Sequence, residues 1–131
     1  MIVADASVLA NAVGDDGSAG DACRGVLEAS DVAVPDLAYA EVASMLRRAW
    51  VSGHHDDARL RVAFTALADL PLISFQTNRQ LLERVYELRE NVTPYDAMYV
   101  ALAESLGVEL HTGDRHLARA PGIRCTIHVI G

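Results

Sequence analysis

The sequence contains no lysine, since all eleven basic residues among its 131 are arginines. A chain without lysine cannot use a P-loop lysine, a lysine Schiff base or a lysine general base. Cysteine is scarce as well, because Cys23 and Cys125 alone cannot build a disulfide framework. We therefore expect two buried free thiols in a reducing compartment.

Long apolar segments are also missing. The longest uninterrupted apolar run covers residues 97–103, far below the ~20 residues that a membrane span requires. The first residues include no basic segment, and Asp5 interrupts their apolar character, so we expect no secretory signal. These absences predict a cytoplasmic protein without a membrane partner.

Positive charge is in deficit, because 18 acidic residues stand against 11 basic ones and give a formal net charge of −7. With 51% hydrophobic and 22% charged residues, the composition is that of one globular domain spanning residues 1–131. The acidic excess argues against binding nucleic acid through net charge alone. An activity on nucleic acid would need local neutralisation, by metal ions or by arginines.

Short apolar runs alternate with helical patterns along the chain. Residues 2–4 and 32–34 are wholly apolar, which is typical of strands buried on both faces of a parallel sheet. Residues 70–75 and 108–112 are further strand candidates, and 123–129 alternates like a half-exposed edge strand. Helical patterns cover roughly 20–29, 36–51, 56–68, 78–89 and 94–106. This order predicts an α/β domain whose mostly parallel central sheet of four or five strands is flanked by helices.

Acidic residues follow several of the expected strands. Asp5, Asp36 and Asp114 each come just after one, at the sheet edge where α/β proteins bind ligands. The same positions also suit helix N-caps, for which aspartate is among the best residues, so capping stays open as an alternative. Thr93 and Asp96 likewise form a capping-box pattern at the start of a helix.

Two of these acids favour a binding site over caps. Asp96 shares a helical stripe with Val100 and Ala103, so it should face the sheet, where a carboxylate needs a donor or a metal. Asp5 ends the most apolar strand and should lie centrally. Converging carboxylates repel one another, and an oxygen-only ligand set favours Mg²⁺ or Mn²⁺. Glu41, by contrast, aligns with the polar Ser44 and Arg48, so its spacing predicts a solvent-exposed position.

Four segments place these acids among small and hydroxyl residues in a characteristic order. They are Asp5-Ala6-Ser7-Val8-Leu9, Pro35 through Glu41-Val42, Thr93-Pro94-Tyr95-Asp96-Ala97-Met98-Tyr99-Val100-Ala101-Leu102-Ala103 and Thr112-Gly113-Asp114-Arg115-His116-Leu117. In order and spacing they resemble the motifs of PIN-domain ribonucleases, particularly the VapC toxins of toxin–antitoxin pairs. The resemblance covers nearly the whole chain, and four motifs in order are far more specific than any one of them.

The resemblance implies a PIN-like fold and a metal-dependent endoribonuclease that leaves a 5′-phosphate and a 3′-hydroxyl. It implies Mg²⁺, with Mn²⁺ as a substitute, held chiefly by Asp5 and Asp96. Glu41 and Asp114 would complete the acidic pocket, so the resemblance raises Glu41 from a surface residue to a site residue. The hydroxyl groups that would orient the carboxylates belong to Ser7 and Thr112. Where some relatives have a further acid or amide, this chain has His116, which affects the fullness of a second metal site.

The resemblance also implies partners: an RNA substrate, a cognate VapB-like antitoxin, and assembly as a homodimer and as a toxin–antitoxin hetero-oligomer. Arg115 and His116 lie near the expected pocket and are candidate substrate contacts. For Arg47, Arg48 and Arg119, surface positions and RNA contacts are both open.

The remaining reactive side chains have simpler explanations. Residues 54–57, His-His-Asp-Asp, favour a capped helix start over a second metal site. His111 is expected to be a packed or edge-strand histidine. Trp50 and the pair Met45 and Leu46 are expected to be core or dimer contacts.

Three other functions remain alternatives to the toxin. The acids could serve only as caps in a non-catalytic interaction module, or the chain could be an RNA-processing nuclease without an antitoxin. An aspartyl-phosphate domain is disfavoured, because residues 5–7 lack the D-x-D pattern and a receiver domain would need a lysine.

Overall fold

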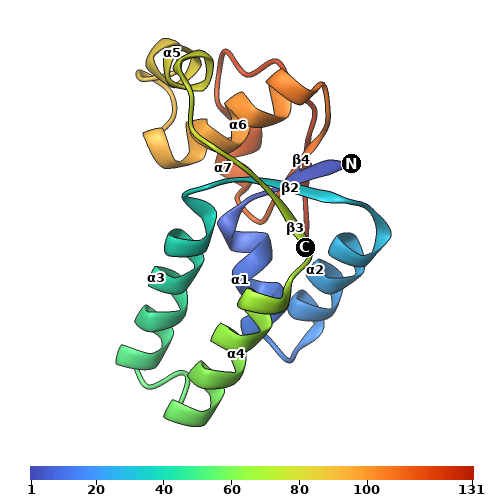
Figure 1. Cartoon of the computed structure of the whole chain (residues 1–131), viewed down its shortest axis with the longest axis vertical. Helices are drawn as coiled ribbons and strands as arrows, with labels where there is room; N and C mark the ends of the chain where they lie inside the picture. Colours follow the sequence, from blue (N-terminus) through green and yellow to red (C-terminus); the bar gives the residue numbers. More distant parts are fainter.

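A parallel five-stranded sheet forms the centre of the computed structural model, which describes all residues 1–131 (Figure 1). In chain order the strands are β1 (Ile2–Ala4), β2 (Val32–Pro35), β3 (Leu72–Phe75), β4 (Leu110–Thr112) and β5 (Ile127–Val129). Their order across the sheet is β3-β2-β1-β4-β5, and every neighbouring pair is parallel. The expected α/β architecture is confirmed, with β1 at the centre and β5 at an edge.

Seven helices surround this sheet. They are α1 (Ala6–Gly14), α2 (Ser18–Ala29), α3 (Ala38–Val51), α4 (Asp57–Asp69), α5 (Arg79–Glu87), α6 (Pro94–Leu106) and α7 (Arg115–Arg119). Figure 1 shows α1, α2, α3 and α4 below the strands, with α5 and α6 above them. None of the seven combines the length and the apolar character that crossing a membrane would require.

Helices α6 and α1 contribute most to the core. Every residue of α6 from Ala97 to Ala103 is buried, and α6 packs against β1, β2 and β4. Six of the nine residues of α1 are buried, between the sheet and helices α2, α3 and α4. Because both helices begin at the carboxyl edge of the sheet, the core fixes the position of the acidic residues at their first turns.

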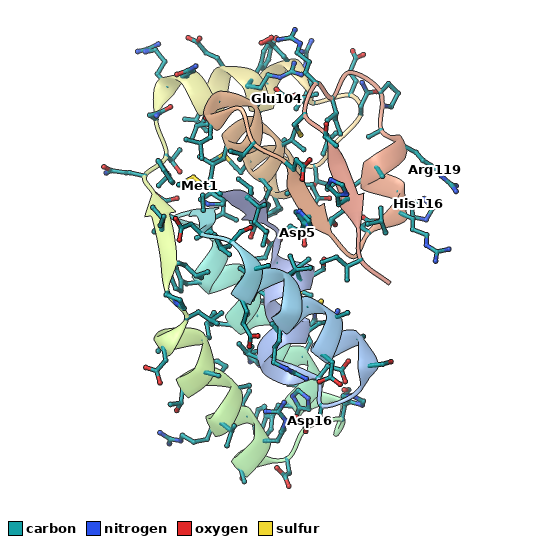
Figure 2. All side chains as sticks on the ribbon, turned by 90° about the vertical axis from the view of Figure 1, so that its right-hand side faces the viewer. Met1, Asp5, Asp16, Glu104, His116 and Arg119 are labelled. Carbon is teal, nitrogen blue, oxygen red and sulfur yellow. The ribbon has the colours of Figure 1, made fainter.

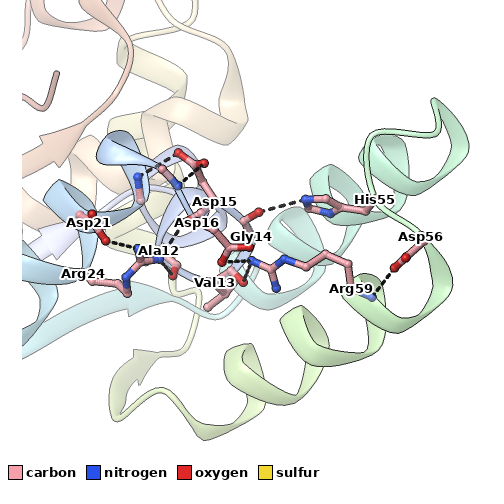
Figure 3. Close-up of polar contacts among 12 residues, drawn as sticks. Ala12, Val13, Gly14, Asp15, Asp16, Asp21, Arg24, His55, Asp56 and Arg59 are labelled. Atoms are coloured by element: carbon pink, nitrogen blue, oxygen red, sulfur yellow. Dashed lines mark hydrogen bonds and ion pairs between the residues drawn. The ribbon is translucent and has the colours of Figure 1, made fainter.

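Arginines anchor the carboxyl end of α1 (Figure 3). The Arg24 guanidinium donates to the carbonyls of Ala12 at 2.9 Å and Asp15 at 2.8 Å. From the other side, Arg59 donates to the carbonyl of Val13 at 3.1 Å. These bonds satisfy carbonyls that a helix end leaves without partners, and a cation there also suits the helix dipole. Two of the eleven arginines are thus structural.

The structure corrects three sequence predictions about the fold. Helices α1 and α7 were not expected: α1 is apolar on most sides and lacks a clear helical period, while α7 has only five residues. The expected edge strand over 123–129 is limited to Ile127–Val129. Its first part is a loop, in which the backbone N–H of Arg124 donates to the Glu104 carboxylate at 2.7 Å.

The residues expected as core or dimer contacts differ in their burial. Leu46 is buried, whereas Trp50 is 41% exposed and donates from Nε1 to the Asp57 carboxylate at 2.6 Å. Both cysteines are free: Cys23 is buried as expected, but Cys125 is only partly buried. Burial raises the pKa of both thiols, that of Cys125 to about 11.

Candidate acidic site at the carboxyl edge of the sheet

Asp5 lies between β1 and α1, at the centre of the carboxyl edge of the sheet (Figure 2). Its carboxylate accepts hydrogen bonds from the Ser7 hydroxyl at 2.5 Å, from the Val8 backbone N–H at 3.2 Å and from the Thr112 hydroxyl. The residue is only 4% exposed. Burial raises the pKa of Asp5, against the lowering effect of its Ser7 and Thr112 hydrogen bonds. Asp5 is therefore an N-cap, the alternative that the sequence left open, but a buried one whose oxygens are bound by Ser7 of α1 and by Thr112 at the end of β4.

The same hydroxyls join the β1–α1 turn to the β4–α7 turn. Ser7 Oγ accepts from the Gly113 backbone N–H at 2.9 Å, and Thr112 Oγ1 accepts from that of Asp114 at 3.0 Å. Gly113 permits this approach, because a Cβ atom there would lie 3.2 Å from Ser7 Oγ. Ser7 and Thr112 thus both hydrogen-bond to Asp5 and connect the turns that follow the adjacent strands β1 and β4.

Asp114 caps α7, accepting from the His116 backbone N–H at 2.8 Å. Its position two residues after β4 brings it to the same edge as Asp5, as expected. The adjoining side chains of His116 and Arg119 extend outward from α7 in Figure 2. Arg115 is also exposed, and its guanidinium donates to the Gly131 carbonyl at 3.3 Å.

Asp96 enters from the first turn of α6. Thr93 is the N-cap of this helix, and its hydroxyl accepts from the Asp96 backbone N–H at 3.3 Å. The pKa of Asp96 is raised to about 6, first by burial and then by repulsion from Asp5, Glu41 and Asp114. The four acids therefore face one region, although they come from four separate segments.

Glu41 joins this group from α3. Its Oε1 accepts a hydrogen bond from the Tyr99 hydroxyl at 2.7 Å, and Tyr99 is fully buried in α6. The helical spacing that predicted a solvent-exposed Glu41 was wrong: Glu41 is half-buried, whereas Ser44 and Arg48 are exposed. The pKa of Tyr99 is raised far above its ordinary range. Burial is the largest cause, and the hydrogen bond to Glu41 is the next.

Tyr99 is a site residue that the sequence reasoning missed. It lies three residues after Asp96 on the same helix, so the two side chains share a face. An isolated hydroxyl in an otherwise apolar helical stripe needs a buried partner, and that requirement could have identified Tyr99. Its partner could not be found this way, because α3 is distant in the sequence.

Asp36 follows a strand but does not join the four acids. Its carboxylate accepts from the Thr77 backbone N–H at 3.0 Å and from the Thr77 hydroxyl at 2.8 Å. These bonds lower the pKa of Asp36. The expected capping role is wrong, since Leu37 is the N-cap residue of α3 and makes no side-chain cap bond. Asp36 instead ties the end of β2 to the segment after β3.

The His-His-Asp-Asp segment is a helix start, as favoured. Asp56 caps α4 by accepting from the Arg59 backbone N–H at 2.8 Å, and the buried His55 contacts the Gly14 carbonyl at 2.9 Å through Nε2 (Figure 3). His111 is half-buried on β4, next to the edge strand β5. Burial lowers the pKa of His111, with repulsion from His128 as the next cause.

The four carboxylates do not form a tight cluster. No three of the carboxylates bring their oxygens within 4.8 Å of one another; the group that meets this limit is Glu109, His111 and His128. Separation is the arrangement that like charges favour. The acidic site thus consists of four carboxylates, of which Asp5 and Glu41 accept hydrogen bonds from hydroxyl groups.

Comparison with known proteins places this arrangement in a family. The family model described as the PIN domain matches residues 2–123. The chain belongs to the PIN-domain family. Ribonuclease VapC1 of Mycobacterium tuberculosis is 41% identical over 128 residues, which cover 98% of this chain and 96% of that protein. Ribonuclease VapC9 of the same organism is 37% identical over 130 residues, covering 99% and 98% of the two chains.

Solved structures of other proteins share the fold. VapBC2 from Rickettsia felis, bound to a DNA fragment from its promoter, matches with a TM-score of 0.72 and 14% identity over all of both chains. The sarcin-ricin-loop-cleaving toxin VapC20 from M. tuberculosis gives a TM-score of 0.69 and 14% identity, covering 95% of this chain and 97% of that one. A toxin–antitoxin complex from Klebsiella pneumoniae gives 0.66 and 21%, covering 98% and 97%. At these identities the likeness concerns the fold.

Proposed function

We propose that this PIN-domain protein is a divalent-metal-dependent endoribonuclease, the toxin of a type II toxin–antitoxin pair. The observation that carries the proposal is the convergence of acids around Asp96, whose pKa is raised first by burial and then by repulsion from Asp5, Glu41 and Asp114. Four acids that repel one another at one edge of a sheet are unfavourable in a purely structural role. The relatives named as VapC ribonucleases support the reaction class.

The donor set fits a hard cation, because each of the four acidic side chains offers carboxylate oxygens. In this proposal Asp5 and Asp96 are the principal ligands of Mg²⁺ or Mn²⁺, while Glu41 and Asp114 complete the pocket. When bound, such an ion lowers the pKa of a coordinated water and offsets the negative charge of the phosphate.

The chain's own side chains hold the carboxylates in place. Ser7 and Thr112 orient the two oxygens of Asp5, and Tyr99 fixes one oxygen of Glu41. In the proposed hydrolysis, the oxygen of water bonds to phosphorus and the bond from phosphorus to the 3′ oxygen breaks. A proton from the water ends on that 3′ oxygen, which gives a 3′-hydroxyl and a 5′-phosphate.

RNA would approach past α7. Arg115 and His116 are exposed beside Asp114, so we propose them as contacts for the substrate phosphates. Together with the bound metal, these residues would offset the overall charge of −7 close to the cleavage site. Arg47 and Arg48 lie exposed on α3 and offer a second basic surface.

We further propose an antitoxin partner of the VapB kind, together with homodimers and toxin–antitoxin hetero-oligomers. The structures of a Klebsiella toxin–antitoxin complex and of Rickettsia VapBC2 support this, since the fold of both extends over nearly all of this chain. A basic antitoxin segment could inhibit by placing an arginine in the acidic pocket. Co-expression of an adjacent small reading frame should then restore growth. Without such rescue, an RNA-processing nuclease lacking an antitoxin is the better assignment.

Cleavage of structured RNA with and without metal tests the enzyme proposal. The protein should cut RNA in Mg²⁺ or Mn²⁺, lose activity in chelator, and lose it in Asp5→Asn and Asp96→Asn. Asp56→Asn is the matched control, because Asp56 caps α4 away from the site. Equal cleavage by the parent and both site variants would refute the assignment. A thermal midpoint unmoved by millimolar Mn²⁺ would favour the interaction module.

A further inference from the structure

A second polar group lies on the outer strands of the sheet and has no part in the proposed ribonuclease chemistry. It consists of Glu109, directly before β4, His111 on β4 and His128 on β5. We propose that these three side chains form a transition-metal site, with Zn²⁺ as the preferred ion. The site would join the edge strand β5 to β4.

Strand geometry places the three side chains together. His111 and His128 are direct partners in the parallel pairing of β4 with β5, and their rings stack with centroids 4.8 Å apart. Glu109 is two residues before His111, so both project from the same face of the sheet. The buried side chain of Thr112, the next residue, reaches Asp5. The alternation along β4 therefore separates this group from the acidic site.

The distances suit a small cation held by three ligands. Glu109 Oε2 lies 3.0 Å from His128 Nε2 and 3.8 Å from His111 Nε2. All three ligand atoms lie within 4.8 Å of one another. With Zn–N and Zn–O bonds of about 2.0–2.1 Å, the ligand atoms of a tetrahedral centre are about 3.3 Å apart. The observed spacings lie on either side of that value, so small side-chain rotations would complete the site.

Hydrogen bonding within the protein leaves His111 unsatisfied. Its Nδ1 atom is buried without a hydrogen-bond partner, and the side chain is only 16% exposed. The 3.8 Å contact of Nε2 with Glu109 is too long for a hydrogen bond. The 3.0 Å contact of Glu109 with His128 therefore accounts for two members of the group, whereas an ion bound to His111 Nε2 would join all three. Nδ1 of His111 has no protein partner in either case.

The ligand types favour zinc over the ions of the acidic site. Two imidazole nitrogens and one carboxylate form a mixed set typical of Zn²⁺, with a fourth position open to water. Glu109 and His128 are about half exposed, which leaves the group accessible from solvent. The acidic site offers oxygen alone, so Mg²⁺ should prefer the acidic site. Zn²⁺ should prefer the group that contains the two histidines.

Zinc binding by untagged, metal-stripped protein in excess Mg²⁺ tests the proposal, because Mg²⁺ occupies oxygen ligands and leaves the histidines free. We expect one equivalent of Zn²⁺ after dialysis, measured by elemental analysis, and a raised thermal midpoint. Co²⁺ in place of Zn²⁺ should give the visible absorption of a four-coordinate centre. His128→Gln and Glu109→Gln should each weaken Zn²⁺ binding at least about tenfold.

His54→Gln is the matched control, since His54 is an exposed histidine beside another histidine but outside the group. It should bind Zn²⁺ like the parent. The proposal is overturned if the parent retains no Zn²⁺, or if His128→Gln and Glu109→Gln bind it equally well. It is also overturned if His54→Gln loses the ion. Circular dichroism of each variant verifies that it is folded, and RNA cleavage in Mg²⁺ remains a separate measurement.

Discussion

The Tyr99 hydroxyl donates a 2.7 Å hydrogen bond to Glu41, connecting the buried face of α6 with α3. Tyr99 itself is fully buried, so its ring is fixed by the core while its hydroxyl reaches the acidic site. Within its own helix, Glu41 belongs to a polar stripe with Ser44 and Arg48, which would place its side chain in solvent. The bond therefore holds a carboxylate at the site that its own helix does not constrain.

Tyr99→Phe should consequently reduce RNA cleavage while keeping the fold. Loss of one hydrogen bond of about 0.5–1.5 kcal/mol predicts a fall of roughly 2- to 10-fold in kcat and a similar loss of stability. Single-turnover cleavage and urea unfolding measure the two effects. Tyr86→Phe is the control, because Tyr86 is 65% exposed on α5. If both variants cleave equally fast, the hydroxyl of Tyr99 does not position Glu41.

Asp114→Asn separates capping from catalysis at one residue. Asparagine caps helices about as well as aspartate, so the bond to the His116 N–H should persist and stability should change by less than about 0.5 kcal/mol. Loss of the negative charge should still lower metal-dependent cleavage by at least about tenfold. Asp56→Asn, at an equivalent cap on α4, should change neither quantity. Full activity in Asp114→Asn would leave Asp114 a cap and nothing more.

The raised pKa of Asp96 predicts a pH dependence of stability in the absence of metal. Its pKa is 3.8 in the unfolded chain and about 6 in the fold, so folding favours the protonated form. This contribution is fully present below pH 3.8 and is lost as the pH rises through 6. Relative to Asp96→Asn, the parent should thus lose unfolding free energy between about pH 4 and pH 7.

Urea unfolding in chelator across this range measures the difference. The exposed Asp69, at the end of α4, supplies the control: Asp69→Asn removes a carboxylate outside the acidic site and is measured over the same range. A parent that gains stability relative to Asp96→Asn as the pH rises would contradict the raised pKa of Asp96 in the folded protein.

Whether the sequence predicts a residue of this site depends on whether local order, helical periodicity or a tertiary contact brings its carboxylate there. Asp5 follows β1 directly and Asp114 follows β4 after one residue, so local order along the chain already places them at the carboxyl edge. Asp96 is found from helical periodicity, because its stripe is apolar. Glu41 is found only through the family resemblance, since its helix has no local feature that turns it inward; a tertiary contact with Tyr99 does so.

The same distinction explains the errors about the fold. Asp36 resembles Asp5 in position, but Thr77, from beyond β3, binds its carboxylate and removes it from the cap. A contact 41 residues away in sequence leaves no local pattern. Helix α1 was missed for the opposite reason: it is buried by several elements, so apolar residues cover most of its surface and the helical period disappears.

The ion pair of Arg84 with Glu104 predicts the largest effect on stability outside the acidic site. Arg84 Nε and Nη2 donate to Glu104 at 2.6 Å and 3.2 Å, Nη2 also donates to the Gly122 carbonyl at 2.6 Å, and both side chains are less than 15% exposed. Glu104→Gln would leave the guanidinium without its counter-charge and should lower the unfolding free energy by about 2–4 kcal/mol. Asp21→Asn removes the acid of an exposed pair, whose Asp21 side chain is 74% exposed, and should cost less than about 1 kcal/mol. Equal losses in the two variants would show that the pair linking α5, α6 and the loop before β5 contributes no more than a surface contact.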